Sequence, residues 1–311
     1  MEENNYDVVI VGGGFGGYSA AIYASRFNLK TIVITKLRGG LITTTHLVEN
    51  YPGFISLTGQ ELATNLEKHV LANNVEIFDD EVNEILKEKN NTFKIKTTYS
   101  GKDFNAKTII LATGTEHRHL NIPGEKEYQG KGVSYCATCD SGFFKDKVVG
   151  IIGGSDSAAK EAMVLAQNSK KVYMFIRTYL KAEPINAERI KSNPKIEIIE
   201  GINIKEIQGN KMKVTNLISD KEINNSNKIN LDGVFIAIGM LPQTELTKNL
   251  NIKFNKKGEI IIDKMSLTSE PGVFAAGDVT DMPWKQGIVG ASQGSIAGYS
   301  AFEYIQKNIK K

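Results

Sequence analysis

Cysteine is scarce in this chain, whose 311 residues include 2 cysteines, 1 tryptophan and 7 prolines. Two cysteines are too few for the disulfide framework of a small secreted protein. No apolar run approaches the roughly 20 residues that a membrane-spanning helix needs. The polar stretch Met1–Asp7 leads into a short apolar run that turns into glycine, unlike a signal peptide. We therefore expect a cytoplasmic protein with no membrane segment.

Strong charge of one sign is also absent. The net charge is +3, and the lysines are scattered rather than gathered in a basic block. This balance gives no reason to expect a nucleic-acid partner. A composition of 41% hydrophobic and 23% charged residues is ordinary for a globular protein, and the length allows two domains.

The two cysteines stand together in Cys136-Ala-Thr-Cys139, followed directly by Asp140. Such a pair can pass between dithiol and disulfide, with the thiolate as nucleophile and the acid as proton carrier. The alternatives are a structural disulfide, which would add little in so short a loop, and half of a zinc site. Zinc would need two more ligands, and no histidine has a spacing paired with the cysteines: His46, His69, His117 and His119.

The first glycine-rich segment has the setting of a dinucleotide-binding turn. An apolar strand predicted over Tyr6–Val11 ends in a loop where Gly12, Gly14 and Gly17 satisfy G-x-G-x-x-G. Small and apolar residues then follow at helical spacing, and Thr31–Thr35 is predicted as the next strand. The first glycine makes the turn, the second admits a pyrophosphate, and the third lets the helix pack against the strand.

A second unit of the same kind follows the cysteines. Its strand is predicted over Lys147–Ile152, its glycine loop over Gly153–Ala158, its helix over Ser157–Asn168 and its next strand over Lys171–Ile176. The predicted fold class is α/β, with two Rossmann-like (three-layer ββα) dinucleotide-binding domains, the second inserted into the first. The expected domains are residues 1–117 with 245–311, and residues 118–244.

Other elements complete this prediction. Two segments suit hinges, 116–120 and 242–245. The remaining predicted elements are a helix over Gln60–Ala72, strands over Phe93–Thr97, Lys107–Leu111, Gly233–Gly239 and Val273–Asp278, and a last helix over Gln286–Ile305.

The order and spacing of these motifs resemble the low-molecular-weight thioredoxin reductase family over nearly the whole chain. Cys136-Ala-Thr-Cys139-Asp140 between two dinucleotide-type units is the most specific of them. The others are Gly12–Gly17, Gly39-Gly40, Thr43-Thr44-Thr45, Val48-Glu49-Asn50-Tyr51-Pro52-Gly53, Ala112-Thr113-Gly114, Gly239–Thr244 and Gly272–Val279.

The resemblance implies an FAD-containing homodimer that reduces the disulfide of thioredoxin or a thioredoxin-like protein. FAD would lie in the first domain, with its pyrophosphate against Gly12, Gly14 and Gly17. Asp278 would meet the ribityl chain or its neighbours, and the last helix would begin at the flavin. The other cofactor positions that the resemblance implies are Thr35, Gly40, Asn50, Thr113, Gly277, Gln286 and Gly287.

The resemblance also gives the cysteine pair a direction. Cys139 would be the sulfur nearest the flavin, and Cys136 would attack the partner's disulfide. Asp140 would donate and accept the proton, which requires partial burial to raise its pKa. A turn or helix N-cap role for Asp140 is compatible with that function.

The electron donor is the open question, because the second loop departs from the family pattern. Ser155 stands where a glycine would allow close approach to a pyrophosphate, and the basic cluster that grips a 2′-phosphate is reduced to Arg177 and Lys181. NADPH, NADH and a ferredoxin remain alternatives as donors. The candidate nicotinamide-nucleotide residues are Gly153, Ser155, Asp156, Ser157, Arg177 and Lys181.

Three functions remain open at this point. The first is a thioredoxin-disulfide reductase, and the second is a flavoenzyme that reduces a different disulfide partner. The third is a flavin redox sensor without turnover, which the joint presence of Cys136, Cys139 and Asp140 disfavours.

Overall fold

The computed structural model describes residues 4–45 and 48–308, and it divides into two units. The first unit comprises Met1–Glu116 and Leu241–Lys311, and the second comprises His117–Met240. The second unit is therefore inserted into the first, between strands β7 (Thr115–His117) and β16 (Met240–Pro242), which pair with each other. The sequence predicts boundaries after residues 117 and 244, and the structure divides the chain after Glu116 and Met240.

The first unit is built on a sheet with the order β3-β2-β1-β6-β5-β4, and β17 also pairs with β6. Strands β1, β2, β3, β6 and β17 are parallel, whereas β4 and β5 are antiparallel. The strands are β1 (Asn5–Val11), β2 (Thr31–Thr35), β3 (Glu76–Asp79), β4 (Val82–Lys87), β5 (Phe93–Thr97), β6 (Asp103–Leu111) and β17 (Val273–Ala275).

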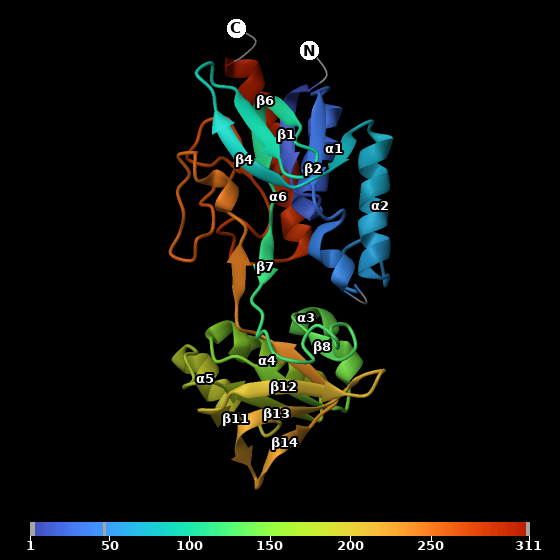
Figure 1. Cartoon of the computed structure of the whole chain (residues 1–311), viewed down its shortest axis with the longest axis vertical. Coiled ribbons are helices and arrows are strands. Elements are labelled where there is room, and N and C mark those ends of the chain that lie inside the picture. Colours follow the sequence, from blue (N-terminus) through green and yellow to red (C-terminus); the bar gives the residue numbers. More distant parts are fainter. Residues whose placement is uncertain (1–3, 46–47, 309–311) are drawn as a thin grey trace. The chain divides into compact units, whose positions relative to one another are not determined.

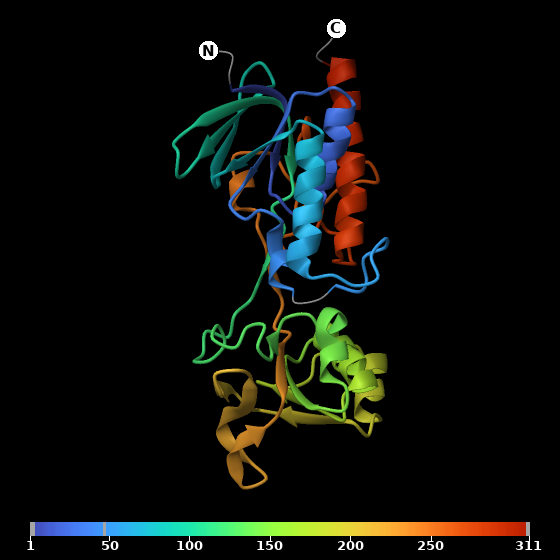
Figure 2. The ribbon, with the colours of Figure 1, turned by 90° about the vertical axis from the view of Figure 1, so that its right-hand side faces the viewer.

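Helices cover one face of this sheet. They are α1 (Phe15–Arg26), α2 (Gly59–Ala72) and α6 (Gly287–Asn308). Helix α6, red in Figures 1 and 2, lies beside the blue α1 although the two are far apart in the sequence. Their backbones approach so closely that a Cβ atom at Gly294 would lie 2.1 Å from the carbonyl oxygen of Gly16. The small residues of the last helix thus serve helix packing.

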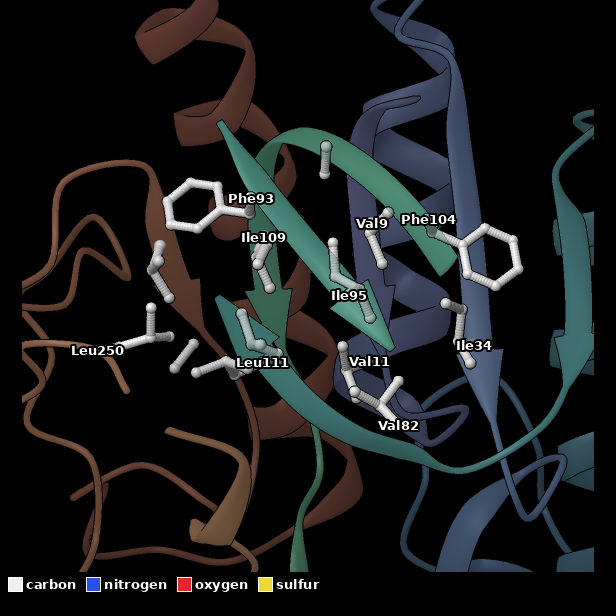
Figure 3. Close-up of a cluster of buried hydrophobic side chains, with 14 of the residues drawn as sticks. Val9, Val11, Ile34, Val82, Phe93, Ile95, Phe104, Ile109, Leu111 and Leu250 are labelled. Carbon is white, nitrogen blue, oxygen red and sulfur yellow. The ribbon is translucent and has the colours of Figure 1, made fainter. Parts of the chain in front are cut away.

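The other face of the parallel strands packs against β4, β5 and nearby loops through a second apolar layer. Val9, Val11, Ile109 and Leu111 point from the parallel strands toward Ile95 and its neighbours (Figure 3). All of these side chains are buried. The first unit therefore has three layers, which are helices, parallel sheet and antiparallel strands.

The second unit repeats this plan. Its parallel sheet has the order β11-β10-β9-β15-β8, and a separate antiparallel sheet has the order β12-β13-β14. One apolar cluster joins the parallel sheet to α4 and α5, and another joins it to the antiparallel sheet. The elements are β8 (Val133–Ser134), α3 (Ala137–Asp140), β9 (Val148–Ile152), α4 (Asp156–Asn168), β10 (Lys171–Ile176), α5 (Pro184–Lys191), β11 (Ile196–Glu200), β12 (Ile204–Gly209), β13 (Val214–Ile223), β14 (Ser226–Asn230) and β15 (Gly233–Ile236).

The predicted fold class, with two Rossmann-like domains and one inserted into the other, is confirmed. The described residues also form three short 3₁₀ helices: η1 (Gly40–Thr44), η2 (Ser141–Phe144) and η3 (Glu245–Thr247). The predicted strand over Gly233–Gly239 is shorter in the structure, where β15 ends at Ile236.

Candidate active site

Cys136 and Cys139 form a disulfide in the second unit, with their Cα atoms 5.3 Å apart. Cys136 is the N-cap of α3, and its sulfur accepts a hydrogen bond from the backbone N–H of Cys139 at 3.2 Å. Both cysteines are partly exposed. A disulfide held in one helical turn near the surface is open to attack by a thiolate from another molecule.

Ser134, at the end of β8, ties Asp140 to the cysteine turn. Its hydroxyl donates to Oδ2 of Asp140 at 2.6 Å and accepts from the backbone N–H of Cys136 at 3.1 Å. The backbone N–H of Asp140 also donates to the Cys136 carbonyl at 3.1 Å. The acid is therefore held on the turn that carries the disulfide. Sequence reasoning missed Ser134, although a hydroxyl two residues before Cys136 was the available signal.

The first glycine loop is folded tightly against two strands. Gly12 has φ +113°, and a Cβ atom there would lie 2.2 Å from the carbonyl oxygen of Ala112. A Cβ atom at Gly17 would lie 1.9 Å from the carbonyl oxygen of Gly12. Thr35, on β2, accepts the N–H of Gly13 through its hydroxyl at 3.0 Å. Gly12 and Gly17 thus allow close backbone contact, and Thr35 supports the loop.

Gly14 differs from its neighbours because the space above it is open. No atom lies within 4 Å of a Cβ atom built at Gly14. Gly14 is the N-cap of α1, no side chain caps this helix, and its first turn has no acidic residue. The first N–H groups of a helix favour an anion when no side chain takes them. The residues present therefore fit a pyrophosphate.

Other predicted cofactor residues of the first unit lie close to this loop or to one another. A Cβ atom at Gly40 would lie 3.1 Å from Cα of Gly14, and one at Gly12 would lie 3.1 Å from the backbone nitrogen of Thr113. Asn50 donates through Nδ2 to Oε1 of Gln286 at 3.3 Å, although 236 positions separate them.

The loop after β17 meets the start of α6 in the same region. A Cβ atom at Gly290 would lie 3.5 Å from Cα of Gly277 and 3.7 Å from the nitrogen of Gly16. Gln293 accepts the N–H of Gly277 at 2.8 Å. Burial raises the pKa of the Asp278 carboxyl, which Lys285 partly offsets.

The first turn of α6 also stands against the first glycine loop. A Cβ atom at Gly287 would lie 2.6 Å from the ring of Phe15. No acidic residue lies in this turn. Sequence reasoning missed Gln293, a buried amide on an otherwise apolar and small-residue helix face.

In the second glycine loop, a side chain of the loop itself caps an N–H group of the following helix. Ser155 is the N-cap of α4, and its hydroxyl accepts the N–H of Ala158 at 3.3 Å and pairs with Ser157 at 3.1 Å. Asp156 lies in the first turn and accepts from the N–H of Glu183 at 3.0 Å and from Asn186 at 2.8 Å. Asp156 also pairs with Lys160 at 2.8 Å. This ion pair contributes most, and together with the two hydrogen bonds it lowers the pKa of Asp156 to about 2.

The loop after β10 reaches this second turn. The N–H of Lys181 donates to the carbonyl oxygen of Gly154 at 2.7 Å, and Lys181 forms a β-bridge with Ser155. Arg177 is exposed just beyond the end of β10. A Cβ atom at Gly153 would lie 2.3 Å from the carbonyl oxygen of Ala237. The structure thus brings Lys181 to the loop and leaves Arg177 on the surface nearby in the chain.

A metal centre has no support in residues 4–45 and 48–308. Within these ranges, no group of three or more His, Cys, Asp and Glu side chains is arranged to hold a metal ion. His46 lies outside the described residues. No described helix is long and apolar enough to cross a membrane.

Comparison with known proteins places the chain among flavin and nicotinamide enzymes. The family described as pyridine nucleotide-disulphide oxidoreductase matches residues 6–301. A thioredoxin reductase from Treponema pallidum is 40% identical, over 97% of this chain and 98% of that protein. A solved thioredoxin reductase from Streptococcus pyogenes superposes with a TM-score of 0.90 at 37% identity, covering 98% of this chain and 100% of that one.

A longer relative shares the same region. An alkyl hydroperoxide reductase component from Pseudomonas putida is 37% identical over 96% of this chain, which spans 58% of that protein's length. The match of the family to most of the chain and the near-complete coverage of the shorter relatives agree with the two glycine loops and the disulfide turn. The chain therefore belongs to the pyridine nucleotide-disulphide oxidoreductase family, within its thioredoxin reductase group.

Proposed function

We propose that the protein is an FAD-dependent thioredoxin-disulfide reductase. The observation that carries this proposal is the partly exposed Cys136–Cys139 disulfide in one turn with Asp140, within a chain that has two dinucleotide-type loops. Residues 1–117 and 245–311 would bind FAD, and residues 118–244 would bind the nicotinamide nucleotide. The family and the thioredoxin reductases that the chain resembles support both assignments.

The residues that would hold FAD surround the start of α1. The open N-cap at Gly14 would receive the pyrophosphate, and the partly buried Asp278 would bond to a hydroxyl of the ribityl chain. Gly12 and Gly17 would hold the loop shape that keeps this helix end free. When bound and reduced by the electron donor, FAD would supply two electrons for the reduction of a disulfide.

The cysteine pair would carry those electrons to the partner. On reduction, the Cys136–Cys139 bond breaks, and the two sulfurs take up two electrons and two protons. The Cys136 thiolate then attacks one sulfur of the thioredoxin disulfide, which breaks and leaves a mixed disulfide. Cys139 next attacks the sulfur of Cys136, re-forming the internal disulfide and releasing thioredoxin as a dithiol. Asp140, fixed by Ser134, would hold the proton exchanged with these sulfurs.

For the donor, we propose a nicotinamide nucleotide without tight recognition of a 2′-phosphate. The pyridine-nucleotide family supports a nicotinamide donor over a ferredoxin. The second loop offers only the exposed Arg177 and Lys181 as cations among the predicted nucleotide residues, and Asp156 adds a negative charge to its first helical turn. NADH is accordingly the preferred donor over NADPH, because the extra phosphate gains little here.

The proposal also includes the oligomeric state of the protein and its location in the cell. The resemblance supports a homodimer, and the two-cysteine composition supports a cytoplasmic location. They would be checked by light scattering of the purified protein and by fractionation of the cells that express it.

Trapping the mixed disulfide tests the proposed function. The Cys139→Ser variant, once reduced, should accumulate a covalent complex with thioredoxin, because the resolving sulfur is missing. The Cys136→Ser variant should form no such complex and should reduce thioredoxin at least about a thousandfold more slowly, with its flavin retained. Thioredoxin reduction by Cys136→Ser at the wild-type rate would refute the assignment.

A second candidate partner is favoured by one observation. The chain matches 58% of an alkyl hydroperoxide reductase component, a protein with additional residues of its own. A glutaredoxin-like or peroxiredoxin-linked disulfide protein would then replace thioredoxin as substrate, with the same chemistry at Cys136. Turnover with each of these proteins in parallel decides between them, and turnover with neither favours the redox sensor.

A further inference from the structure

Glu125 is a buried acid that the proposed chemistry does not use. It lies in the second unit, in the segment between β7 and β8, and it is 2% exposed. Its Oε2 accepts the backbone N–H of Asn121 at 2.7 Å, and its Oε1 accepts that of Leu120 at 3.0 Å. The hydroxyl of Tyr135 donates to the same Oε1 at 2.7 Å. Glu125 thus joins the segment after β7 to Tyr135, the residue directly before Cys136.

Two histidines also contact Tyr135. Nδ1 of His119 lies 2.9 Å from the Tyr135 hydroxyl, and the ring of His117, the last residue of β7, stacks on the Tyr135 ring at 4.8 Å. The phenol has a single proton, which it donates to Glu125, so Nδ1 of His119 is the donor in their contact. We call these four residues, Glu125, His117, His119 and Tyr135, the tyrosine cluster.

The ionisation of the tyrosine cluster favours its hydrogen bonds. Burial raises the pKa of Glu125, but the bonds from Tyr135, Leu120 and Asn121 outweigh burial, so that the pKa is lowered overall. Burial and the neighbouring Glu125 raise the pKa of Tyr135. Near neutral pH the carboxylate is therefore ionised and the phenol keeps its proton. A buried carboxylate that accepts several donors is costly to separate from them.

Cys136 is held from both sides along the chain. The tyrosine cluster fixes the residue before it, and the N–H of Cys136 donates to the Ser134 hydroxyl at 3.1 Å. On the other side, the carbonyl of Cys136 accepts the N–H of Asp140 at 3.1 Å. After reduction, the disulfide re-forms only when the sulfurs of Cys136 and Cys139 meet. A backbone already held in the disulfide geometry raises the effective concentration of each sulfur at the other.

We propose that Tyr135 is a positioning residue for the redox pair, which, held by the tyrosine cluster, keeps Cys136 in the geometry that favours the Cys136–Cys139 bond. This inference deepens the proposed function and rests on it for the identity of the electron acceptor. A dithiol that closes readily into a disulfide gives up its two electrons readily. The tyrosine cluster would therefore make the reduced pair a stronger reductant toward the disulfide of a partner.

Equilibration of the purified protein with reduced and oxidised dithiothreitol tests the proposal without thioredoxin. Each reduced dithiothreitol breaks one Cys136–Cys139 bond, gives two electrons and two protons to the sulfurs, and closes its own cyclic disulfide. Alkylation after an acid quench, followed by mass spectrometry, counts the free thiols at each ratio. The equilibrium constant for reduction should be about threefold to tenfold larger in Tyr135→Phe than in the wild type, because the ring stays and the hydroxyl bonds are lost.

Two further variants separate this effect from a general disturbance. Tyr173→Phe is the matched control, since it is the same change on β10 of the same unit, and it should follow the wild type. Glu125→Gln loses an acceptor oxygen and should shift the equilibrium constant in the same direction as Tyr135→Phe. The double variant should shift it by less than the product of the two single effects, because both changes act on one hydrogen bond.

Three results would overturn the proposal. They are an equilibrium constant for Tyr135→Phe that equals the wild-type value or lies below it, an equal shift in Tyr173→Phe, or single effects that combine in full in the double variant. Failure of the wild type to reduce thioredoxin would count against the proposed function and leave the dithiothreitol equilibrium readable. The two failures are therefore distinguishable.

Hydrogen exchange of the wild type covers the case in which the variants do not fold. If the tyrosine cluster favours the disulfide, the disulfide must by linkage favour the tyrosine cluster. The N–H groups of Leu120 and Asn121, which bond to Glu125, should therefore exchange faster in the dithiothreitol-reduced protein than in the oxidised protein. Equal or slower exchange after reduction would contradict the proposal.

Discussion

The two glycine loops share a strand–turn–helix frame and differ in what meets the first turn of the helix. At α1 the N-cap is Gly14, with open space above it and no acid in the first turn. At α4 the N-cap is Ser155, whose own hydroxyl accepts a helical N–H, and Asp156 adds a negative charge. The first helix end is free for an anion, whereas the second already has a partner within the protein.

Under the proposed function, this difference would separate a permanently bound FAD at the first loop from a nicotinamide nucleotide that binds and leaves at the second. A dinucleotide at the first loop would meet free N–H groups, and one at the second loop would have to compete with Ser155. The last position of the G-x-G-x-x-G pattern also differs. The first loop has Gly17 there, in close contact with Gly12, whereas the second loop has room for the side chain of Ala158. The first loop is the more tightly built and the more sensitive to change.

The largest effect is expected for Gly17→Ala. Its Cβ would lie 1.9 Å from the carbonyl oxygen of Gly12, so the loop has to move. We expect a loss of about 3 kcal/mol or more in the free energy of unfolding, together with loss of flavin. The matched change in the second loop, Ala158→Gly, should cost about 1 kcal/mol. Urea denaturation of both variants measures the contrast, and equal losses would remove it.

Gly14→Asp comes next, because it gives the first loop a feature of the second. The open space allows the side chain, but a carboxylate at the N-cap of α1 would take the helical N–H groups and repel a pyrophosphate. We expect flavin affinity to fall at least about tenfold relative to Gly14→Asn, the uncharged control. The ratio of flavin to protein absorbance after gel filtration gives the result, and equal flavin content in both variants would count against the account.

Ser155→Gly makes the opposite exchange, with a smaller effect. Removal of the hydroxyl frees the N–H of Ala158 for a phosphate, so the KM for the nicotinamide nucleotide should fall about threefold to tenfold. Ser157→Ala is the control, since it removes the neighbouring hydroxyl and leaves the N-cap. An unchanged or higher KM for Ser155→Gly would show that Ser155 does not compete with the nucleotide.

The smallest effect is a pH dependence at Asp156. Its pKa in the folded state, about 2, lies below the value near about 3.9 of an unfolded aspartate. Asp156 therefore stabilises the fold above about pH 4, and this contribution is lost as the pH falls toward 2. Asp156→Asn should be less stable than the wild type at neutral pH, and the difference should shrink in acid. A difference that is constant with pH would contradict the assignment of its bonds.

The sequence predicts the repeated strand–loop–helix frame well. Thr31–Thr35, Phe93–Thr97 and Lys171–Ile176 coincide with β2, β5 and β10, because buried β-branched runs bounded by polar residues are a strong signal. The antiparallel strands β12, β13 and β14 escape prediction. Their exposed positions alternate with buried ones and carry many charges, so their apolar content is diluted.

The site is predictable where it follows a motif and not where it depends on packing. The disulfide turn and the glycine loops stand in the sequence as contiguous patterns. The contact of Ser134 with Asp140 depends on how β8 lies against α3, and the contact of Asn50 with Gln286 joins two segments that are far apart in the sequence. No spacing in the sequence brings Ser134 to Asp140 or Asn50 to Gln286, so the sequence alone does not predict these contacts.

The central claim is that the first loop retains its cofactor and that the second accepts a nucleotide briefly and without a 2′-phosphate preference. Anaerobic titration of the gel-filtered protein with NADH and NADPH in parallel, followed by flavin absorbance, tests both parts. We predict that the flavin stays bound through filtration and bleaches at lower concentrations of NADH than of NADPH. Loss of the flavin on filtration, or bleaching at lower NADPH than NADH, would contradict the account.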